Sequence, residues 1–244
     1  MTDLSREFLQ RNQEKIELLA ADEELKQLTH QWFVASSQHE YSYHFTWMGR
    51  PIIQFPQDMI AMQEIIWQTR PDVIIETGIA HGGSLIYYAS LCEMIGHGAV
   101  LGVDVDIRAH NRTEIEKHSM YKRITMLEGS SVDEEIARQV HEYAQGKSVL
   151  LILDSNHTHN HVLRELELYS PLVKKGGYLV VFDTIIEDMP DDFFPERPWG
   201  VGDNPKTAVR EFLTKNDRFQ IDASIPDKLL ITVAPDGYLK CVKD

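Results

Sequence analysis

Cysteine is scarce in this chain, and long apolar runs are missing from it. The 244 residues contain two cysteines, Cys92 and Cys241, and no Cys-x-x-Cys pair. Two cysteines are too few for a disulfide framework, which favours a reducing cytoplasm. No stretch approaches the roughly 18 consecutive apolar residues of a membrane-spanning helix, and residues 1–14 lack the apolar region of a signal peptide. We therefore expect a soluble, cytoplasmic protein that does not enter a membrane.

Positive charge is also in short supply. Lysine and arginine number 24 against 38 aspartates and glutamates, so the formal net charge is −14 and the pI lies near 5.2. Such a chain repels phosphate backbones and anionic lipid surfaces, which argues against a nucleic-acid partner. The length suits one α/β domain that buries its core without disulfide support.

What the chain does contain is a regular alternation of strand and helix patterns after residue 58. Nearly continuous apolar runs such as VIIETG and YLVVFD are typical of strands that are covered on both faces. The expected strands cover 72–76, 99–106, 124–128, 148–154, 178–183, 218–223 and 229–234, and the expected helices cover 58–68, 84–95, 112–118, 132–144, 159–172 and 205–215. This order predicts an α/β, Rossmann-like fold with a doubly wound, mostly parallel seven-stranded sheet.

The chain divides into an N-terminal extension, residues 1–58, and a main domain, residues 59–244. Residues 5–38 show a charged helical pattern that predicts one or two helices outside the main domain, a common place for a dimer contact. Residues 41–56 are aromatic and irregular, and they form either a loop over a ligand or an arm on a partner. We expect a homo-oligomer.

The most informative motif is the glycine-rich turn after the first expected strand of the main domain. Glu76 ends that strand, and Gly78, Gly82 and Ser84 follow at the start of a helix. A carboxylate here would repel the pyrophosphate of a nicotinamide cofactor, whose turn reads G-x-G-x-x-G. It suits the ammonium group of S-adenosylmethionine (SAM), so we predict these four residues as SAM contacts. The same glycines also fit an ordinary strand-to-helix turn, since glycine adopts positive φ freely.

Further acids end the next strands, at the edge where doubly wound sheets bind ligands. Asp104 follows Glu76 by 28 residues, a spacing suited to an acid that binds a ribose diol, and Asp106 is the rival candidate. Ser130 is expected as a SAM contact beside the adenine ring, whereas Ser131 next to it is expected to cap a helix. Each acid can instead be a helix cap.

Asp154 ends a further strand and precedes His157, His159 and His161. His157 lies closest to the strand edge, so we predict Asp154 and His157 as catalytic, with His157 the general base for a substrate hydroxyl. Asp154 and Asp183 end neighbouring strands and suit a hard cation such as Mg²⁺. Asp154 is also predicted as a SAM contact. A zinc pair of His157 and His161 is the alternative. His159 and His161 are otherwise expected on a helix surface.

Together, the motifs E-T-G-x-x-x-G-G-S, V-D-V-D, D-S-N-H and V-V-F-D resemble those of the cephalosporin hydroxylase family of SAM-dependent O-methyltransferases. The resemblance spans roughly residues 47–190, and W-G-x-G-D-N-P at residues 199–205 is similar to members that act on sugars. The family also contains surface-polysaccharide O-methyltransferases. The resemblance implies that Asp154 binds a divalent metal and that His157 is the base.

One departure from the family concerns the metal. The family's usual Glu-Asp strand ending is Phe182-Asp183 in this chain. Since one carboxylate remains there, a third ligand must come from water, substrate or the Glu187-Asp188 pair. No iron triad of two histidines and a carboxylate stands out, so the word "hydroxylase" is no evidence of oxidation.

These residues predict a SAM-dependent O-methyltransferase, optionally assisted by Mg²⁺, that acts on a hydroxyl of a sugar, sugar nucleotide or related small molecule. Such a reaction belongs to surface-glycan or secondary-metabolite biosynthesis. The rivals are an NAD-dependent sugar reductase or epimerase, for which Tyr143 and Lys147 have the required spacing, and a non-catalytic binding protein.

Two segments are expected to cover the acceptor pocket. They are residues 41–55 and the loop of residues 184–204, which is too long for a plain connection. Arg197 and Lys206 are candidates for pairing with acceptor phosphates. The alternative for the long loop is a solvated acidic surface.

Overall fold

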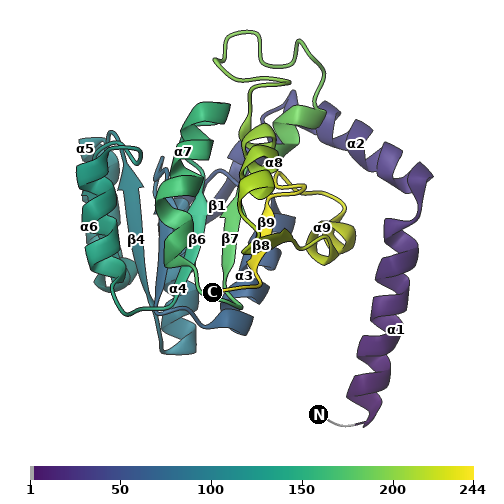
Figure 1. Cartoon of the computed structure of the whole chain (residues 1–244), viewed down its shortest axis with the longest axis horizontal. Helices are drawn as coiled ribbons and strands as arrows, with labels where there is room; N and C mark the ends of the chain where they lie inside the picture. Colours follow the sequence, from purple (N-terminus) through teal and green to yellow (C-terminus); the bar gives the residue numbers. More distant parts are fainter. Residues whose placement is uncertain (1–2) are drawn as a thin grey trace.

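A computed structural model describes residues 3–244, which form a central sheet with helices on both faces and a helical N-terminal extension (Figure 1). The sheet strands are β3 (Val73–Thr77), β4 (Ala99–Asp104), β5 (Ile124–Glu128), β6 (Val149–Leu153), β7 (Tyr178–Val181), β8 (Phe219–Ile221) and β9 (Tyr238–Cys241). The helices are α1 (Asp3–Ala20), α2 (Glu23–Ser37), α3 (Pro56–Thr69), α4 (Gly83–Ile95), α5 (Ala109–Lys117), α6 (Glu134–Ala144), α7 (His159–Tyr169), α8 (Pro205–Lys215) and α9 (Ser224–Leu229).

The strand order is β5-β4-β3-β6-β7-β9-β8, and every neighbouring pair up to β7 is parallel. β9 runs antiparallel to both β7 and β8. The order reverses beside β3, where chains of this type bind ligands outside the carboxyl ends of the strands. The predicted doubly wound, mostly parallel seven-stranded sheet is confirmed.

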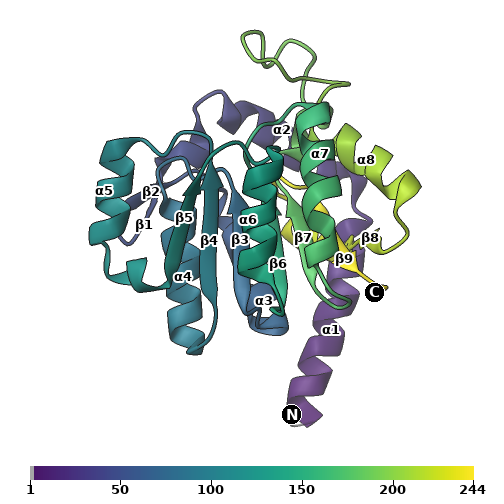
Figure 2. The same ribbon diagram turned by 60° about the vertical axis from the view of Figure 1, so that its left-hand side comes forward.

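Alternating side chains of each strand belong to two separate cores. Val73 and Ile75 pack with residues of α6, α7 and α8, whereas Ile74 packs with residues of α3 and α4. Figure 2 shows α6 and α7 on one face of the sheet and α4 behind it. Because successive side chains point to opposite faces, Glu76 shares the face of Ile74 and lies under α4.

Helices α1 and α2 cover most of residues 5–38, as predicted. α1 runs away from the sheet in both ribbon views and contacts α9 (Figures 1 and 2). Phe33 of α2 and Phe55 stack with ring centroids 4.8 Å apart, and both are buried in the α3–α4 core. Within residues 3–244, no helix has the length and apolar content to cross a membrane.

The expected strand at 229–234 is wrong. α9 occupies Ser224–Leu229, and the sheet instead takes its last strand from Tyr238–Cys241. Asp58 explains the difference, because its fully buried carboxylate accepts hydrogen bonds from the Val233 N–H (3.0 Å) and from the Thr232 hydroxyl. The segment therefore binds the start of α3 and not a neighbouring strand.

Residues 41–56 are more regular than expected. The segment contains a hairpin of β1 (Phe45–Trp47) and β2 (Arg50–Ile52). Its turn residues have φ of 44° and 86°, as two-residue hairpin turns require.

The expected Ser131 cap is wrong. The cap of α6 is Asp133, whose carboxylate accepts from two N–H groups of the first turn.

Candidate active site

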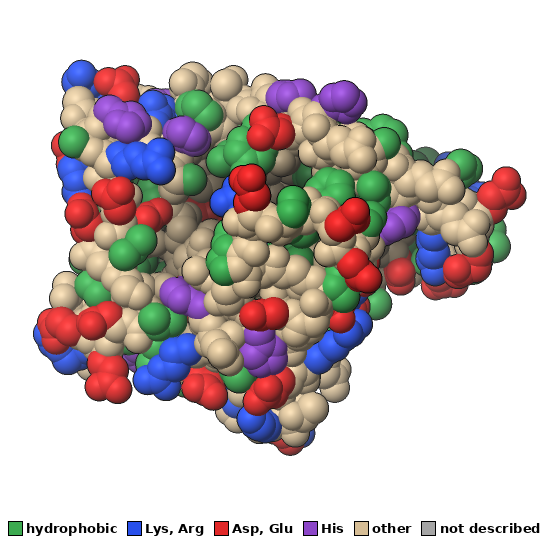
Figure 3. Space-filling model, turned by 90° about the horizontal axis from the view of Figure 1, so that it is seen from above, with side chains coloured by type: hydrophobic (Ala, Val, Ile, Leu, Met, Phe, Trp, Pro, Cys, Tyr) green, Lys and Arg blue, Asp and Glu red, His purple; other side chains and the backbone are tan. Residues whose placement is uncertain are grey.

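A cavity of about 420 Å³ lies at the carboxyl ends of the strands. Figure 3 looks onto this end of the molecule, which is hollowed between acidic and apolar side chains. The cavity lining includes residues of the glycine loop (residues 78–83), residues that follow β6 and β7, and residues of two covering segments. The covering segments are the arm (residues 41–55) and the covering loop (residues 184–204), which line the same cavity as expected.

The glycine loop depends on glycine for its own packing. Gly78 has φ +91°, and a Cβ there would stand 2.0 Å from the backbone oxygen of Asp154. Gly82 has φ +79°, and a Cβ there would stand 2.3 Å from Ile115. The positive φ expected from sequence is confirmed, but the close neighbours are protein atoms. The loop can therefore lie directly against the residue that follows β6.

Glu76 is a fully buried acid beneath the glycine loop. One carboxylate oxygen accepts a hydrogen bond of 2.6 Å from the hydroxyl of Ser84, which itself lines the cavity. The other oxygen is buried without a partner. Burial raises the pKa of Glu76 to about 8, and the nearby Asp104 adds to the increase.

Asp104 and Ser130 lie outside the cavity lining. The Asp104 carboxylate accepts from the backbone N–H groups of Ile79 (2.7 Å) and Asp106 (3.0 Å), so it holds the glycine loop. The Ser130 backbone oxygen accepts from the N–H of Asp133. The ribose and adenine contacts predicted for Asp104 and Ser130 therefore stay predictions.

A clamp that sequence reasoning missed holds the outer side of the glycine loop. Arg50 of the hairpin donates to the His81 carbonyl through Nη2 (2.5 Å) and Nε (3.1 Å), and to Asn111 through Nη2 (3.0 Å). The buried Asn111 in turn donates to the Ala80 carbonyl at 2.9 Å. No motif marks Arg50, because its partners lie 31 and 61 residues away.

The predicted catalytic and metal residues converge. One ligand atom each of Asp154, His157 and Asp183 lies within 4.8 Å of the other two, and all three residues line the cavity. His157 Nε2 stands 3.3 Å from a carboxylate oxygen of Asp183, and the imidazole meets the Trp199 ring edge-on at 4.8 Å. Burial raises the pKa of Asp154 well above its usual range, and the charges of Asp183 and Glu76 add to this.

His159 and His161 differ from the expected helix-surface position, since both are half-buried and hydrogen-bonded. His161 Nε2 lies 3.1 Å from the hydroxyls of both Ser131 and Ser155. His159 bonds to residues of α8. His157 and His161 share no partner, and the only group with metal-ligand geometry within residues 3–244 is the one of Asp154, His157 and Asp183. Among residues 3–244, no such group therefore joins His157 to His161, and the zinc pair receives no support.

The covering loop uses its acids for internal contacts. Glu187 accepts hydrogen bonds from the N–H of Gly202 (2.8 Å) and from the side chain of Asn204. Lys206 is buried between Asp188 (2.7 Å) and Asp236 (3.2 Å). The Glu187-Asp188 pair is thus wrong as a source of a third metal ligand, and Lys206 is engaged within the protein.

The pair that supported the reductase alternative lies elsewhere. Lys147 donates to the Tyr143 carbonyl (2.5 Å) and stands 3.9 Å from the centre of its ring. Neither residue lines the cavity, and Tyr143, which belongs to α6, is partly buried against the core. The spacing therefore reflects a local contact.

Comparison with known proteins decides the family. Residues 39–242 match the family model described as Rhamnosyl O-methyltransferase/CmcI. The chain belongs to this family. It is similar to the rhamnosyl O-methyltransferase of Mycobacterium tuberculosis, with 34% identity over 224 residues that cover 84% of each chain. The Mycobacterium leprae protein of that name is 31% identical over 199 residues, which cover 80% of this chain and 82% of that one.

Solved structures agree on the fold. An apo-structure of CmcI has a TM-score of 0.59 at 20% identity, and the match covers 83% of this chain and 78% of that one. A CmcI structure with Mg and SAM has a TM-score of 0.58 at 20% identity and covers 82% and 77% of the two chains. The predicted membership of the Rhamnosyl O-methyltransferase/CmcI family, with its Rossmann-like methyltransferase fold, is confirmed.

Proposed function

We propose that this protein is a SAM-dependent O-methyltransferase that acts on a hydroxyl of a sugar. The observation that carries the proposal is the convergence of Asp154, His157 and Asp183 at one cavity beside the glycine loop. Family membership and relatives named rhamnosyl O-methyltransferases support a sugar acceptor. The acceptor sugar can be part of a sugar nucleotide or of another glycoside. The reaction would then belong to surface-polysaccharide or secondary-metabolite biosynthesis.

The site fits SAM, which supplies the methyl group of its sulfonium when bound. Glu76 keeps a buried carboxylate oxygen without a partner, which suits the ammonium group of this cofactor. Gly78, Gly82 and Ser84 form the loop over that acid. We assign the ribose to Asp104 and the adenine side to Ser130, after the usual arrangement of such sheets.

SAM affinity should rise with pH up to about 8. In the free protein the carboxyl of Glu76, with a pKa of about 8, is mostly protonated at pH 7. Pairing with an ammonium favours the carboxylate, so binding releases a proton and Kd falls roughly tenfold per pH unit below that pKa. Calorimetry at pH 7 in two buffers of different ionisation enthalpy should report release of about one proton.

The matched variant is Glu76→Gln, which cannot ionise. It should release no proton from this site and bind SAM roughly 10- to 100-fold more weakly, the value of a hydrogen bond to a charged group. Equal proton release by both proteins would remove Glu76 from the SAM site.

Asp154, Asp183 and His157 also fit a divalent cation such as Mg²⁺, because two carboxylates and an imidazole approach one point. A cation held there would lower the pKa of an acceptor hydroxyl that it contacts. His157 has a second role open to it: its Nε2 is held by Asp183 and its ring by Trp199, so it can take the hydroxyl proton as general base.

Transfer of label from methyl-labelled SAM to rhamnosides and to nucleotide-linked rhamnose tests the proposed reaction. We expect a labelled sugar ether as product. Absence of product with every sugar, together with SAM binding, would favour the non-catalytic alternative. Binding of NADH in place of SAM would favour the reductase.

The Arg50 clamp predicts a selective effect on SAM binding. Arg50→Ala removes three donated hydrogen bonds that fix the His81 carbonyl and Asn111. We expect KM for SAM to rise about tenfold or more, with kcat changed little, because the loop loses its ordered shape. The matched control is Arg112→Ala, since Arg112 forms a surface ion pair with Glu128. Equal KM for SAM in both variants would contradict the clamp.

We also propose that residues 1–58 and 59–244 form one globular unit, since Phe33 and Phe55 are buried in the core of the main domain. A homo-oligomer is supported by the exposed apolar side chains of α1, which are Leu4, Phe8, Leu9 and Leu18. A cytoplasmic location is supported by Cys92 and Cys241, which are both buried free thiols.

A further inference from the structure

Gln54, just after the hairpin, is a buried polar residue whose side chain has no partner. The residue is 5% exposed, and its side-chain amide oxygen makes no hydrogen bond. Its backbone N–H is satisfied by the Ser42 carbonyl at 3.2 Å. The unmet requirement therefore belongs to the side chain alone.

The position of Gln54 separates it from the other buried oxygens of this kind. Within residues 3–244, five buried side-chain oxygens lack a partner, and they belong to Gln54, Gln57, Glu76, Thr77 and Glu165. Gln54 alone among these residues lines the cavity that contains Asp154, His157 and Asp183. A buried polar group without a partner costs free energy, so its retention at a ligand cavity calls for a ligand.

The wall of the cavity that contains Gln54 combines apolar residues with polar residues of the arm, such as Ser42 and Tyr43. Phe33, Ile52, Phe55 and Val233 are buried apolar residues that line the same cavity. A primary amide offers one acceptor and two donors, which matches the combined donor and acceptor character of neighbouring sugar hydroxyls. A sugar hydroxyl that reaches this part of the cavity would therefore find its partner in Gln54.

We propose that Gln54 is a specificity-determining residue that hydrogen-bonds a non-reacting hydroxyl of the acceptor sugar. This inference rests on the proposed function and adds the residue that selects the acceptor. Gln54 belongs to the arm, outside the sheet, whereas Asp154, His157 and Asp183 follow sheet strands. Acceptor choice and methyl-transfer chemistry thus reside in different parts of the chain.

The test is Gln54→Met, which keeps the side-chain length and removes the amide. Thermal unfolding of the ligand-free protein should show Tm raised by roughly 2–4 °C, because an unsatisfied buried amide is lost. With methyl rhamnoside as acceptor, kcat/KM should fall about tenfold or more, and KM for SAM should stay unchanged. The matched control is Gln27→Met, an exposed position on α2, which should alter neither quantity.

Deoxy analogues of methyl rhamnoside then identify the hydroxyl. For the analogue that lacks the hydroxyl bound by Gln54, the wild type should lose as much kcat/KM as the Gln54→Met substitution costs with methyl rhamnoside. The variant should show no further loss with that analogue. A lowered Tm with unchanged acceptor kinetics would mean that the amide serves the fold, and would overturn the inference. If the wild type methylates rhamnoside and Gln54→Met has the same acceptor kinetics as the wild type, this inference alone is overturned. Failure of the wild type to methylate any sugar would overturn the proposed function as well.

Discussion

Replacing His157 by alanine is expected to lower kcat by about 100- to 10,000-fold, the usual contribution of a positioned general base. SAM affinity should change little, because His157 lies with Asp183 and Trp199 and not in the glycine loop. Turnover of labelled SAM at saturating acceptor measures the first quantity, and calorimetry measures the second. An unchanged kcat would remove His157 from the mechanism.

Two controls separate the base from a metal ligand. His110→Ala removes an exposed histidine of α5 and should leave kcat unchanged. Imidazole added to the His157→Ala protein should restore part of the rate if the lost group is a base. A higher Mg²⁺ requirement without imidazole rescue would instead make His157 a ligand.

Removal of divalent metal with EDTA is expected to reduce turnover by about 100-fold or more, since a bound cation contributes several kcal/mol at the reacting oxygen. Added Mg²⁺ should restore the rate. Asp183→Asn should increase the Mg²⁺ concentration needed by at least the roughly 10- to 100-fold that metal-supporting residues contribute. Because the pKa of Asp154 is raised, a proton competes with the metal, and apparent Mg²⁺ affinity should increase with pH.

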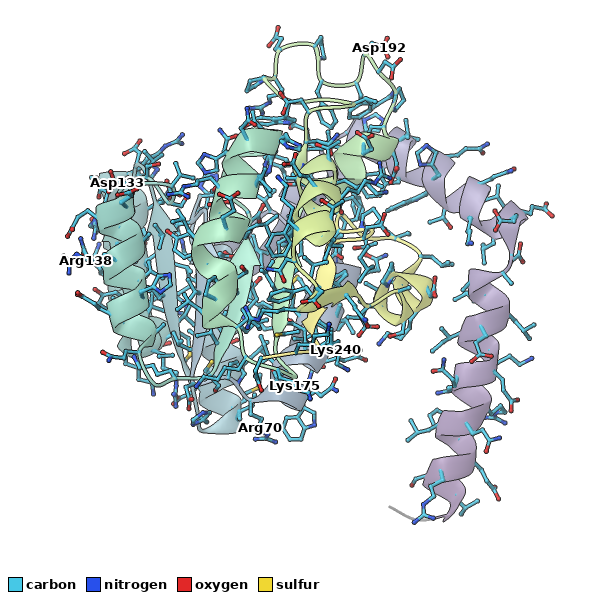
Figure 4. The ribbon with its side chains drawn as sticks, in the orientation of Figure 1. Arg70, Asp133, Arg138, Lys175, Asp192 and Lys240 are labelled. Atoms are coloured by element: carbon cyan, nitrogen blue, oxygen red, sulfur yellow. The ribbon has the colours of Figure 1, made fainter. Side chains whose placement is uncertain are left out.

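The control for the metal prediction lies on the covering loop. Asp192 is exposed at the outer tip of this loop (Figure 4), so Asp192→Asn makes the same chemical change away from the cluster. Its Mg²⁺ dependence should match that of the wild type. Full activity in EDTA would exclude a role for metal, and the three-residue cluster would then serve acid–base chemistry alone.

The convergence of Asp154 and Asp183 was predictable because both follow parallel strands whose carboxyl ends meet at one edge. The buried acid Glu76 was predictable for the same reason. Phe182 replaces one carboxylate of the family's usual strand ending, and His157 is the third group of the cluster. Strand order brings these residues together without help from distant contacts.

The residues around this cluster were not predictable, because their positions depend on how the arm and the covering loop pack. Arg50 and Gln54 follow no motif, and their roles arise only when the hairpin lies against the glycine loop and the cavity. The sequence predicts Lys206 as a candidate for a phosphate, whereas the structure pairs its buried ammonium group with Asp188. Long-range ion pairs of this kind leave no periodic signal in a sequence.

The interleaved order of the last strands constrains how the molecule is assembled. β9 follows β8 along the chain but lies between β7 and β8 in the sheet. β8 therefore has no hydrogen-bonding neighbour until residues 238–241 have been inserted, and until then the edge of β7 stays open to pairing with another polypeptide. During synthesis or refolding, the interval before this insertion is when the protein is most exposed to aggregation.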